Sequence, residues 1–428
     1  MELIKLPYKI GIPIVNYLRT LGIEPRKDNG GGLSFQFTQE ELDQVLEIQI
    51  DEPTAGCLQG IEHCHNLKSL KVINKSYSAF SNSNMSISDA DIKIIAKLTS
   101  LESLSIVGQK GITWVDVTDL VNLGFLSIER NNGIDLVEGL ESLEKIKEIS
   151  IFGNKELFDL RGVVNLIEHN KLDVLELDLL NFPEVSGMMP KLLAIPNCQF
   201  YETCSSGKDV HYNCATASLF QKRCLEITKE ILSQKPENTL STIILIEKYI
   251  AEHITYDYDA LEREGRFHET DGVRRGYSNG TQSAYNGLMY GSCVCEGYTR
   301  SMQYLLKLLD IKAKNVYCIG GKDKIKINEH YGNKVELPDD GYHSIIRVEV
   351  GDAMYYCDPC WDSCRWHRGD TSLSYCLKNR SDISRNHTLS FEENGVGGIY
   401  PSISQEYIES LLNKNRELEE SNTSDIRK

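Results

Sequence analysis

The feature that most constrains the fold of this chain is a pattern of three apolar residues that recurs through its first half. In each copy the second apolar residue follows the first by three positions, and the third follows the second by two. The copies are Val45-Ile48-Ile50, Leu67-Leu70-Val72, Leu101-Leu104-Ile106, Leu123-Leu126-Ile128, Ile146-Ile149-Ile151, Leu172-Leu175-Leu177 and a degenerate Ile195-Cys198-Phe200. The steps between their last residues are 22, 34, 22, 23, 26 and 23. The pattern predicts a short strand in each copy, and the near-constant step predicts that the copies stack.

A step in the low twenties is typical of leucine-rich repeats, so we predict an α/β leucine-rich repeat solenoid of the bacterial kind over residues 1–202. Asparagine follows three of the strands, at Asn74, Asn131 and Asn154. The long step coincides with the Ser/Asn-rich stretch Tyr77–Ser88, which indicates an inserted loop. Residues 1–40 would cap the first repeat, with a helix over Ile14–Leu21. An ordinary α/β domain with leucine-rich strands is the alternative, which six well-formed copies disfavour.

The repeat stops at a polar stretch, and we place a linker at residues 203–214. Residues 215–395 would form a second, α+β domain, and residues 396–428 a helical or partly disordered tail. Apolar residues at helical spacing predict helices around Leu219–Ile231 and Ile243–Ile250. A polar, glycine-rich loop at residues 261–280 is long enough to be a lid or a disordered segment.

Charge and cysteine usage limit the class of protein. The net charge of −16 argues against a chain that wraps nucleic acid, because phosphate binding needs clustered Lys and Arg. No apolar run is long enough to span a membrane, and the first residues do not resemble a signal peptide. Thirteen cysteines spread over the chain indicate reduced thiols, so we expect a cytoplasmic protein. Export without a cleaved signal stays open.

The residues that carry chemistry lie between positions 290 and 362. Cys295 precedes an amphipathic stretch, Met302–Leu309, and a cysteine at a helix start has its thiolate stabilised by the helix dipole and free N–H groups. His343 opens a strand pattern, and Asp358 follows the strand Ala353–Cys357. A helix followed by two antiparallel strands can bring a nucleophile, a base and an orienting carboxylate together.

These motifs resemble the transglutaminase-like branch of the papain-like cysteine proteinase superfamily. The matching residues are Val294-Cys295-Glu296-Gly297-Tyr298, then His343, then Asp358-Pro359-Cys360-Trp361-Asp362. The resemblance covers roughly residues 215–390 and includes the region up to His387, where the family often carries another histidine. It implies a papain-like fold with a cysteine-bearing helix packed on an antiparallel sheet, and a triad of Cys295, His343 and Asp358.

The family pattern also suggests pocket residues and shows two departures. Gln282 and Tyr285 are candidates for an oxyanion donor, and Trp361 for a pocket wall. The family usually has an aromatic residue two positions after the histidine and a threonine before the tryptophan, where this chain has Ile345 and Cys360. The second thiol, Cys293, is interpreted as a buried small apolar residue.

Two groups of cysteines have spacings that could indicate metal sites. Cys357, Cys360 and Cys364 have a spacing that suggests zinc, but His367 is the one nearby fourth ligand, and a metal there would compete with Asp358. Cys204, His211 and Cys214 form a weaker group, which is interpreted as incidental. We therefore expect no metal and no cofactor.

The predicted function is cysteine-dependent acyl transfer on a protein or peptide amide, with a thioester intermediate resolved by water or by an amine. Hydrolysis is favoured because water needs no second binding site. The repeats would bind a protein partner, with no nucleic acid or membrane involved. The alternative is a catalytically inactive transglutaminase-like fold that acts with the repeats as a binding scaffold. The sequence does not indicate the substrate or the oligomeric state.

Overall fold

The computed structural model describes all residues except 1–2, 25, 28–33, 75–84, 155, 158, 205–208, 260–279, 321–341, 390–399 and 427–428. Most of the predicted inserted loop and of the predicted 261–280 loop therefore lies outside the described residues. The chain forms two compact units. The first comprises residues 1–203 and 211–217, and the second residues 204–210 and 218–428.

The first unit begins with a small α/β layer. Helix α1 (Tyr8–Thr20) accompanies a three-stranded antiparallel sheet of order β1-β3-β2, and α2 (Gln39–Leu42) follows it. The strands are β1 (Ile4–Pro7), β2 (Arg26–Lys27) and β3 (Ser34–Phe37). A helix covers most of the expected Ile14–Leu21 stretch, but it begins earlier, at Tyr8, holds Pro13 in its interior and ends at Thr20. In α2, Thr38 and Glu41 form a capping box that fixes the helix start.

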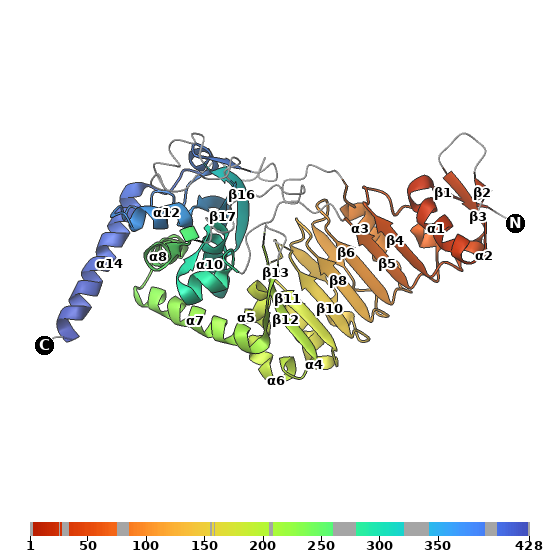
Figure 1. Cartoon of the computed structure of the whole chain (residues 1–428), viewed down its shortest axis with the longest axis horizontal. Coiled ribbons are helices and arrows are strands. Elements are labelled where there is room, and N and C mark those ends of the chain that lie inside the picture. The colour runs from red at the N-terminus through yellow and green to blue at the C-terminus, as the bar shows by residue number, and fades with distance from the viewer. Residues whose placement is uncertain are drawn as a thin grey trace. The chain divides into compact units, whose positions relative to one another are not determined.

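The seven predicted repeat strands and β13 form one sheet of eight strands, in the order β13-β12-β11-β10-β8-β6-β5-β4. Figure 1 shows them side by side. Their bounds are β4 (Glu47–Asp51), β5 (Ser69–Ile73), β6 (Ser103–Val107), β8 (Phe125–Glu129), β10 (Glu148–Phe152), β11 (Val174–Asp178), β12 (Asn197–Thr203) and β13 (Asp209–Asn213). From β4 to β12 neighbouring strands are parallel.

The register follows the sequence repeat. The last apolar residues of the copies are Cα partners across the sheet, in the row Ile50, Val72, Ile106, Ile128, Ile151, Leu177, Phe200. All of them are buried, because alternate residues of a strand face the same side. The degenerate last copy therefore does form a strand.

Buried amides connect successive copies behind these strands. The Asn131 amide donates to the Ile106 carbonyl over 3.0 Å and accepts from the Gln109 N–H over 2.8 Å. Asn154 repeats the pattern one copy later, since its amide donates to the Ile128 carbonyl over 2.8 Å. Gln109 takes the place of the asparagine in its own copy. The amides satisfy backbone groups that the turns leave buried.

Short elements return the chain between these strands. They are α3 (Asp89–Ile95), β7 (Trp114–Asp116), β9 (Leu136–Glu138), α4 (Arg161–His169), α5 (Phe182–Val185), α6 (Met189–Leu192), and single 3₁₀ turns at Ile61–His63, Leu140–Ser142, Leu179–Asn181 and Ser186–Met188. Strands β7 and β9 pair in parallel.

The stretch predicted as a linker, residues 203–214, contains strand residues and the first residue of a helix. Strand β12 extends to Thr203, residues 209–213 form β13 at the sheet edge, and helix α7 (Cys214–Ser233) begins directly afterwards. Polar composition does not prevent an edge strand, because one face of such a strand meets water.

The second unit places helices against an antiparallel sheet of order β18-β17-β16-β19. Its strands are β16 (Ala313–Gly320), β17 (Tyr342–Val350), β18 (Ala353–Cys357) and β19 (His387–Leu389). Its other elements are α8 (Thr239–His253), β14 (Thr255–Tyr256), a π-helical turn (Asn286–Tyr290), β15 (Ser292–Cys293), α10 (Cys295–Leu308), α12 (Pro359–Trp366), α13 (Arg380–Ile383) and α14 (Gln405–Ile426). Helix α10 packs on β16 and β17, and also contacts α8 and α12.

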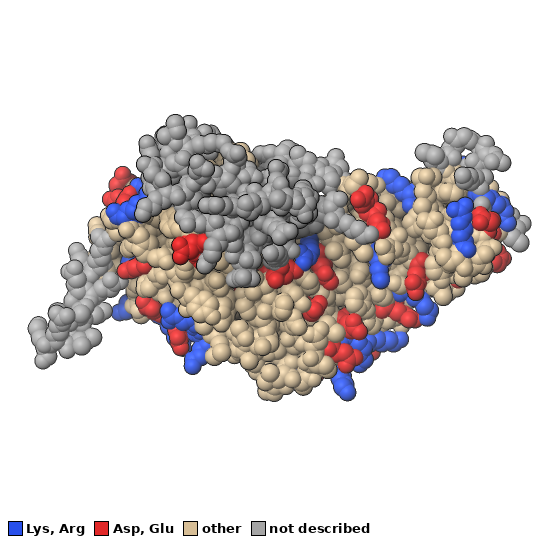
Figure 2. Space-filling model, in the orientation of Figure 1, with Lys and Arg blue, Asp and Glu red and all other residues tan. Residues whose placement is uncertain are grey.

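Charged side chains of both signs are interspersed on the face that Figure 2 shows. The net charge of −16 is therefore not gathered into one acidic patch among the described residues of that face. Among the described helices, none combines the length and the apolarity that crossing a bilayer requires.

Candidate active site

Cys295 is the first residue of α10, and its thiol is partly accessible. Of the thirteen cysteines, eleven are buried, and only Cys295 and Cys198 are not. The helix turns directly after the cap residue Val294, whose carbonyl accepts from the Gly297 N–H over 2.8 Å. A thiol at this position faces the positive end of the helix dipole and the unpaired N–H groups of the first turn.

His343 and Asp358 meet in a buried hydrogen bond beside this helix start. His343 lies near the beginning of β17, and Asp358 follows the last residue of β18, with which β17 pairs antiparallel. The Nε2 of His343 lies 2.8 Å from Oδ2 of Asp358. Because Nε2 is engaged there, Nδ1 is the nitrogen left to interact with Cys295, which is close enough to influence the ionisation of His343. The three predicted triad residues thus lie together.

The charges of this pair hold both groups in their ionised forms. Burial would lower the pKa of His343, but the charge of Asp358, its hydrogen bond and the contact with Cys295 outweigh burial and raise it to about 10. Burial would likewise raise the pKa of Asp358, but the charge and hydrogen bond of His343 and the hydrogen bond of His387 lower it instead. An ionised, buried Asp358 fixes the orientation of the imidazole.

His387 is a second histidine on the same carboxylate. It begins β19, is fully buried, and places Nε2 3.0 Å from the same Oδ2 atom of Asp358. Its Nδ1 lies 3.2 Å from the Ile383 carbonyl oxygen, so the ring is held at both edges. The sequence placed His387 near the motif without a role, because the contact depends on β19 joining the sheet next to β16.

Trp361 packs against both histidines, next to the Asp358 carboxylate. Its ring centroid lies 5.3 Å from that of His343 and 4.4 Å from that of His387. Gly320 makes room for this stack: a Cβ there would lie 3.1 Å from the Trp361 ring and 3.2 Å from the His343 Cβ.

A buried polar network joins the cysteine helix to the sheet. The Thr299 hydroxyl, one turn after Cys295, donates to the Glu296 carbonyl over 2.9 Å and lies 3.0 Å from Oδ1 of Asn315 on β16. Ser344, next to His343, donates to the same Asn315 oxygen. These contacts fix the distance between the nucleophile's helix and the strand of the base.

The other predicted pocket residues have different surroundings. Tyr285 packs its ring against Phe220 and Tyr290, with centroids 5.5 and 5.7 Å apart, and no described contact joins it to Cys295. Gln282 is buried in a segment that lies beside the nucleophile, because the Val294 N–H donates to the Thr281 carbonyl over 2.9 Å. Gln282 therefore remains the better placed candidate for an oxyanion donor.

Three further residues of the motif pack in the interior. Cys293 is fully buried, as expected, and it faces Gly297, where a Cβ would come within 2.5 Å of the Cys293 Cβ. Ile345 belongs to a buried cluster with Val316 and Tyr356. Glu296, next to the nucleophile in the motif, is buried and pairs with Arg300 over 2.9 Å.

The cysteines whose spacing could indicate a metal site, Cys357, Cys360 and Cys364, do not all lie together. Cys360 and Cys364 influence each other's ionisation, but Cys357 lies instead with Cys376. The reason is that Cys357 ends a strand whereas Cys360 and Cys364 lie on the following helix. Cys214 interacts with Cys198, and the His211 ring lies near Tyr201. His343, Asp358 and His387 form a further cluster of groups that can bind metals, here joined by hydrogen bonds.

Comparison with known proteins identifies no family. No family model matches the chain, and no curated protein matches it. Similar solved structures include an internalin from Listeria monocytogenes (23% identity, TM-score 0.29, 40% of this chain and 46% of that one). They also include a TGase, at 15% identity and a TM-score of 0.24, over 33% of this chain and 32% of that one. A third is a proposed cysteine protease from Cytophaga hutchinsonii, at 14% identity and a TM-score of 0.22, over 42% of this chain and 48% of that one. The chain spans less than half of each of these structures, and TM-scores this low carry no argument.

Proposed function

We propose that this protein is a cysteine-dependent acyl-transfer enzyme that acts on a protein or peptide amide. Cys295 is the nucleophile, His343 the base and Asp358 the group that orients the base. The observation that carries the proposal is the buried 2.8 Å contact between His343 and Asp358, beside a partly accessible thiol at a helix start. This combination is what thiol activation requires.

The chemistry follows from these contacts. In the reactive state the thiol proton of Cys295 already resides on Nδ1 of His343, whose imidazolium form Asp358 favours, and the sulfur of Cys295 adds to the amide carbonyl carbon. The N–H groups at the start of α10 stabilise the oxyanion, with Gln282 as a candidate further donor. When the carbon–nitrogen bond breaks, the imidazolium returns the proton to the leaving amine, and a thioester remains on Cys295.

Water or an amine then attacks the thioester, and His343 takes a proton from that second nucleophile. The same triad serves a protease, an amidase and a transglutaminase. Hydrolysis is favoured, because it requires no binding site for a second substrate.

The strand face of the first unit is proposed as a leucine-rich repeat surface that binds a protein partner. The alternate residues of the strands form a second registered row: Gln49, Lys71, Ser105, Ser127, Ser150, Glu176 and Gln199. The three serines of this row are buried, and its accessible polar side chains, Gln49, Lys71, Glu176 and Gln199, would suit a partner recognised by hydrogen bonds.

A small activated ester tests acyl transfer without knowledge of the substrate. With p-nitrophenyl acetate, we expect a burst of p-nitrophenolate, one acetyl group on Cys295 by peptide mass mapping, and loss of both in Cys295→Ser. Added glycine methyl ester distinguishes the fates of the thioester, since an acetylated amine forms only if an amine competes with water. A folded wild-type protein that shows no acetylation of Cys295 would support the inactive scaffold instead.

A further inference from the structure

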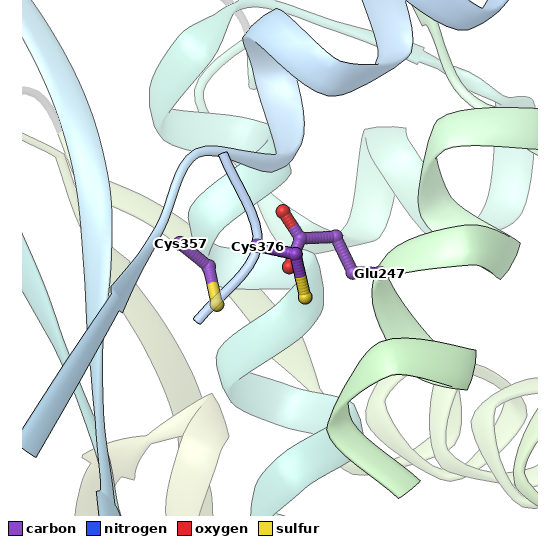
Figure 3. Close-up of side chains that lie close together, drawn as sticks. All are labelled: Glu247, Cys357 and Cys376. Carbon is purple, nitrogen blue, oxygen red and sulfur yellow. The ribbon is translucent and has the colours of Figure 1, made fainter. Parts of the chain in front are cut away.

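A fully buried cluster of titratable groups adjoins the triad along the chain, since one of its members, Cys357, directly precedes Asp358. It contains Glu247 from α8, Cys357 at the end of β18 and Cys376 from the segment that follows α12 (Figure 3). All three side chains are 0% exposed. One ligand atom from each lies within 4.8 Å of the other two.

Glu247 is the unusual member of this cluster. It occupies the middle of a helix whose residues from Ser241 to Ala251 are all buried. Neither of its carboxylate oxygens has a hydrogen-bond partner within the described chain. A buried carboxylate without donors costs several kcal/mol, so a group that compensates it is expected.

In the described part of the chain, no Lys or Arg is among the main influences that act on the carboxyl groups of this cluster. Burial is the largest influence on Glu247 and raises its pKa, and the next influences come from Cys357, Cys376 and Asp362. Burial followed by the charge of Glu247 raises the pKa of the neighbouring Asp362, which is 1% exposed. Two thiols and the Glu247 carboxyl group thus lie together in the interior, and the Asp362 carboxyl group neighbours Glu247.

The backbone holds these groups in place. Tyr356 and Lys378 form a β-bridge that aligns the segment of Cys376 with the end of β18. The Leu377 N–H donates to the Cys357 sulfur over 3.2 Å, and the Tyr375 N–H donates to the Asp362 carboxyl over 3.0 Å. Hydrogen bonds from backbone groups to ligand atoms are typical of the second layer around protein metal sites.

We infer that Glu247, Cys357 and Cys376 bind a structural zinc ion, and that Asp362, which neighbours Glu247 but lies outside this group of three, turns toward the ion as the fourth ligand. An ion at the centre of three atoms no more than 4.8 Å apart lies within about 2.8 Å of each, and a small contraction reaches the roughly 2.0–2.3 Å of zinc ligands. Two thiolates favour zinc over magnesium or calcium, which prefer oxygen ligands alone. The buried, four-ligand set is that of a structural site.

Binding is an exchange of protons and water for the metal. Cys357 and Cys376 lose their S–H protons to solvent, and Glu247 and Asp362 lose the carboxyl protons that burial favours. Two zinc–sulfur and two zinc–oxygen bonds form, and the hydrated ion releases its water, with no change of oxidation state. The ion ties α8 to the end of β18. Since Asp358 directly follows Cys357, the site also anchors the backbone of the orienting carboxylate.

The test uses the full chain with Cys295→Ser, so that the nucleophile cannot contribute a metal–thiolate signal. We expect about one zinc per chain by elemental analysis after reconstitution and dialysis, as a four-ligand site implies. We also expect Co²⁺ to give thiolate charge-transfer and tetrahedral d–d bands, and zinc to raise the Tm.

Variants locate the ion. In Cys376→Ala and Cys357→Ala the cobalt–thiolate bands should weaken or vanish, and in Glu247→Gln zinc affinity should fall by at least about 10- to 100-fold, the loss typical of even second-layer changes. Cys224→Ala, at another fully buried thiol, is the matched control and should bind zinc like its parent. Near-ultraviolet circular dichroism checks that each variant is folded.

Three results would overturn the inference. The first is a folded parent that retains no zinc and shows no cobalt–thiolate band, which means that the four groups share protons instead. The second is full zinc binding in both cysteine variants, which would move the ion to His343, Asp358 and His387. The third is loss of zinc in Cys224→Ala to the same degree as in Cys376→Ala.

Discussion

At the scale of single residues, the Asp358 carboxylate holds three parts of the site together. Oδ2 faces both histidines, at 2.8 and 3.0 Å, and Oδ1 accepts from the Trp361 N–H over 3.0 Å. We expect Asp358→Asn to keep this shape and to slow acetylation of Cys295 by roughly 10³–10⁴-fold, as the matching change does in serine triads. Burst kinetics with p-nitrophenyl acetate measure the effect. A loss of less than tenfold would mean that Asp358 only supports the fold.

The His343 imidazole predicts a pH dependence of stability. Its pKa is raised from 6.5 to about 10, so between these values the folded state holds a proton that the unfolded state has lost. The contribution of His343 is complete below about pH 6.5 and disappears as the pH rises through about 10. The difference in unfolding free energy between wild type and His343→Gln, from urea titrations, should therefore shrink from pH 7 to pH 10. A difference independent of pH would contradict the raised value.

His387 predicts a positioning role through Asp358. His387→Phe keeps an aromatic ring beside Trp361 but removes the hydrogen bond to the carboxylate. We expect alkylation of Cys295 to slow by about 10- to 100-fold, since a hydrogen bond to a charged group is worth roughly 1.5–3 kcal/mol. His387→Gln, which keeps a donor, should recover part of the rate. Equal rates in both variants, well below their Tm, would reduce His387 to a packing role.

At the scale of elements, the start of α10 depends on the absence of a side chain at Gly297. A Cβ there would lie 2.5 Å from the Cys293 Cβ and 3.0 Å from the Thr281 carbonyl oxygen. We expect Gly297→Ala to destabilise the fold by about 1–3 kcal/mol, the usual cost of overpacking, despite the better helix propensity of alanine. Lys307→Ala, near the other end of the helix, should change stability by no more than about 0.5 kcal/mol. Thermal unfolding of both variants measures these stability changes. An unchanged Tm in Gly297→Ala would show that the helix start can shift.

Features that depend on local spacing could be predicted from the sequence, whereas contacts between distant elements could not. The strand register from Ile50 to Phe200 follows from the spacing of apolar residues, because that spacing is a local property. The Cys295 helix start and the strand of His343 were predicted for the same reason. The groupings of His387 with Asp358 and of Cys376 with Cys357 depend on which strands and loops become neighbours, and spacing along the chain does not contain that information. The cysteine spacing at Cys357, Cys360 and Cys364 therefore gives no indication that Cys357 lies beside Cys376.

At the scale of the whole molecule, the division into two compact units predicts separable effects. Asn131 is fully buried in the first unit and satisfies backbone groups of neighbouring copies. Asn131→Ala should lower the unfolding free energy by about 2–4 kcal/mol, because each orphaned buried group costs roughly 1–3 kcal/mol. Below the Tm the acetylation of Cys295 should be unchanged. Burst kinetics measure the acetylation of Cys295, and urea titrations measure the unfolding free energy. A loss of acetylation that accompanies the loss of stability would mean that the second unit depends on the first.

The central claim is that Cys295 is the activated thiol of this molecule. The most direct measurement is the rate of alkylation by iodoacetamide at neutral pH, mapped to each of the thirteen cysteines by peptide mass spectrometry. We expect Cys295 to react much faster than Cys198, the other cysteine that is not buried, and His343→Ala to abolish this advantage. Equal rates at Cys295 and Cys198 in the folded wild type, or a Cys295 rate that does not depend on His343, would contradict the account.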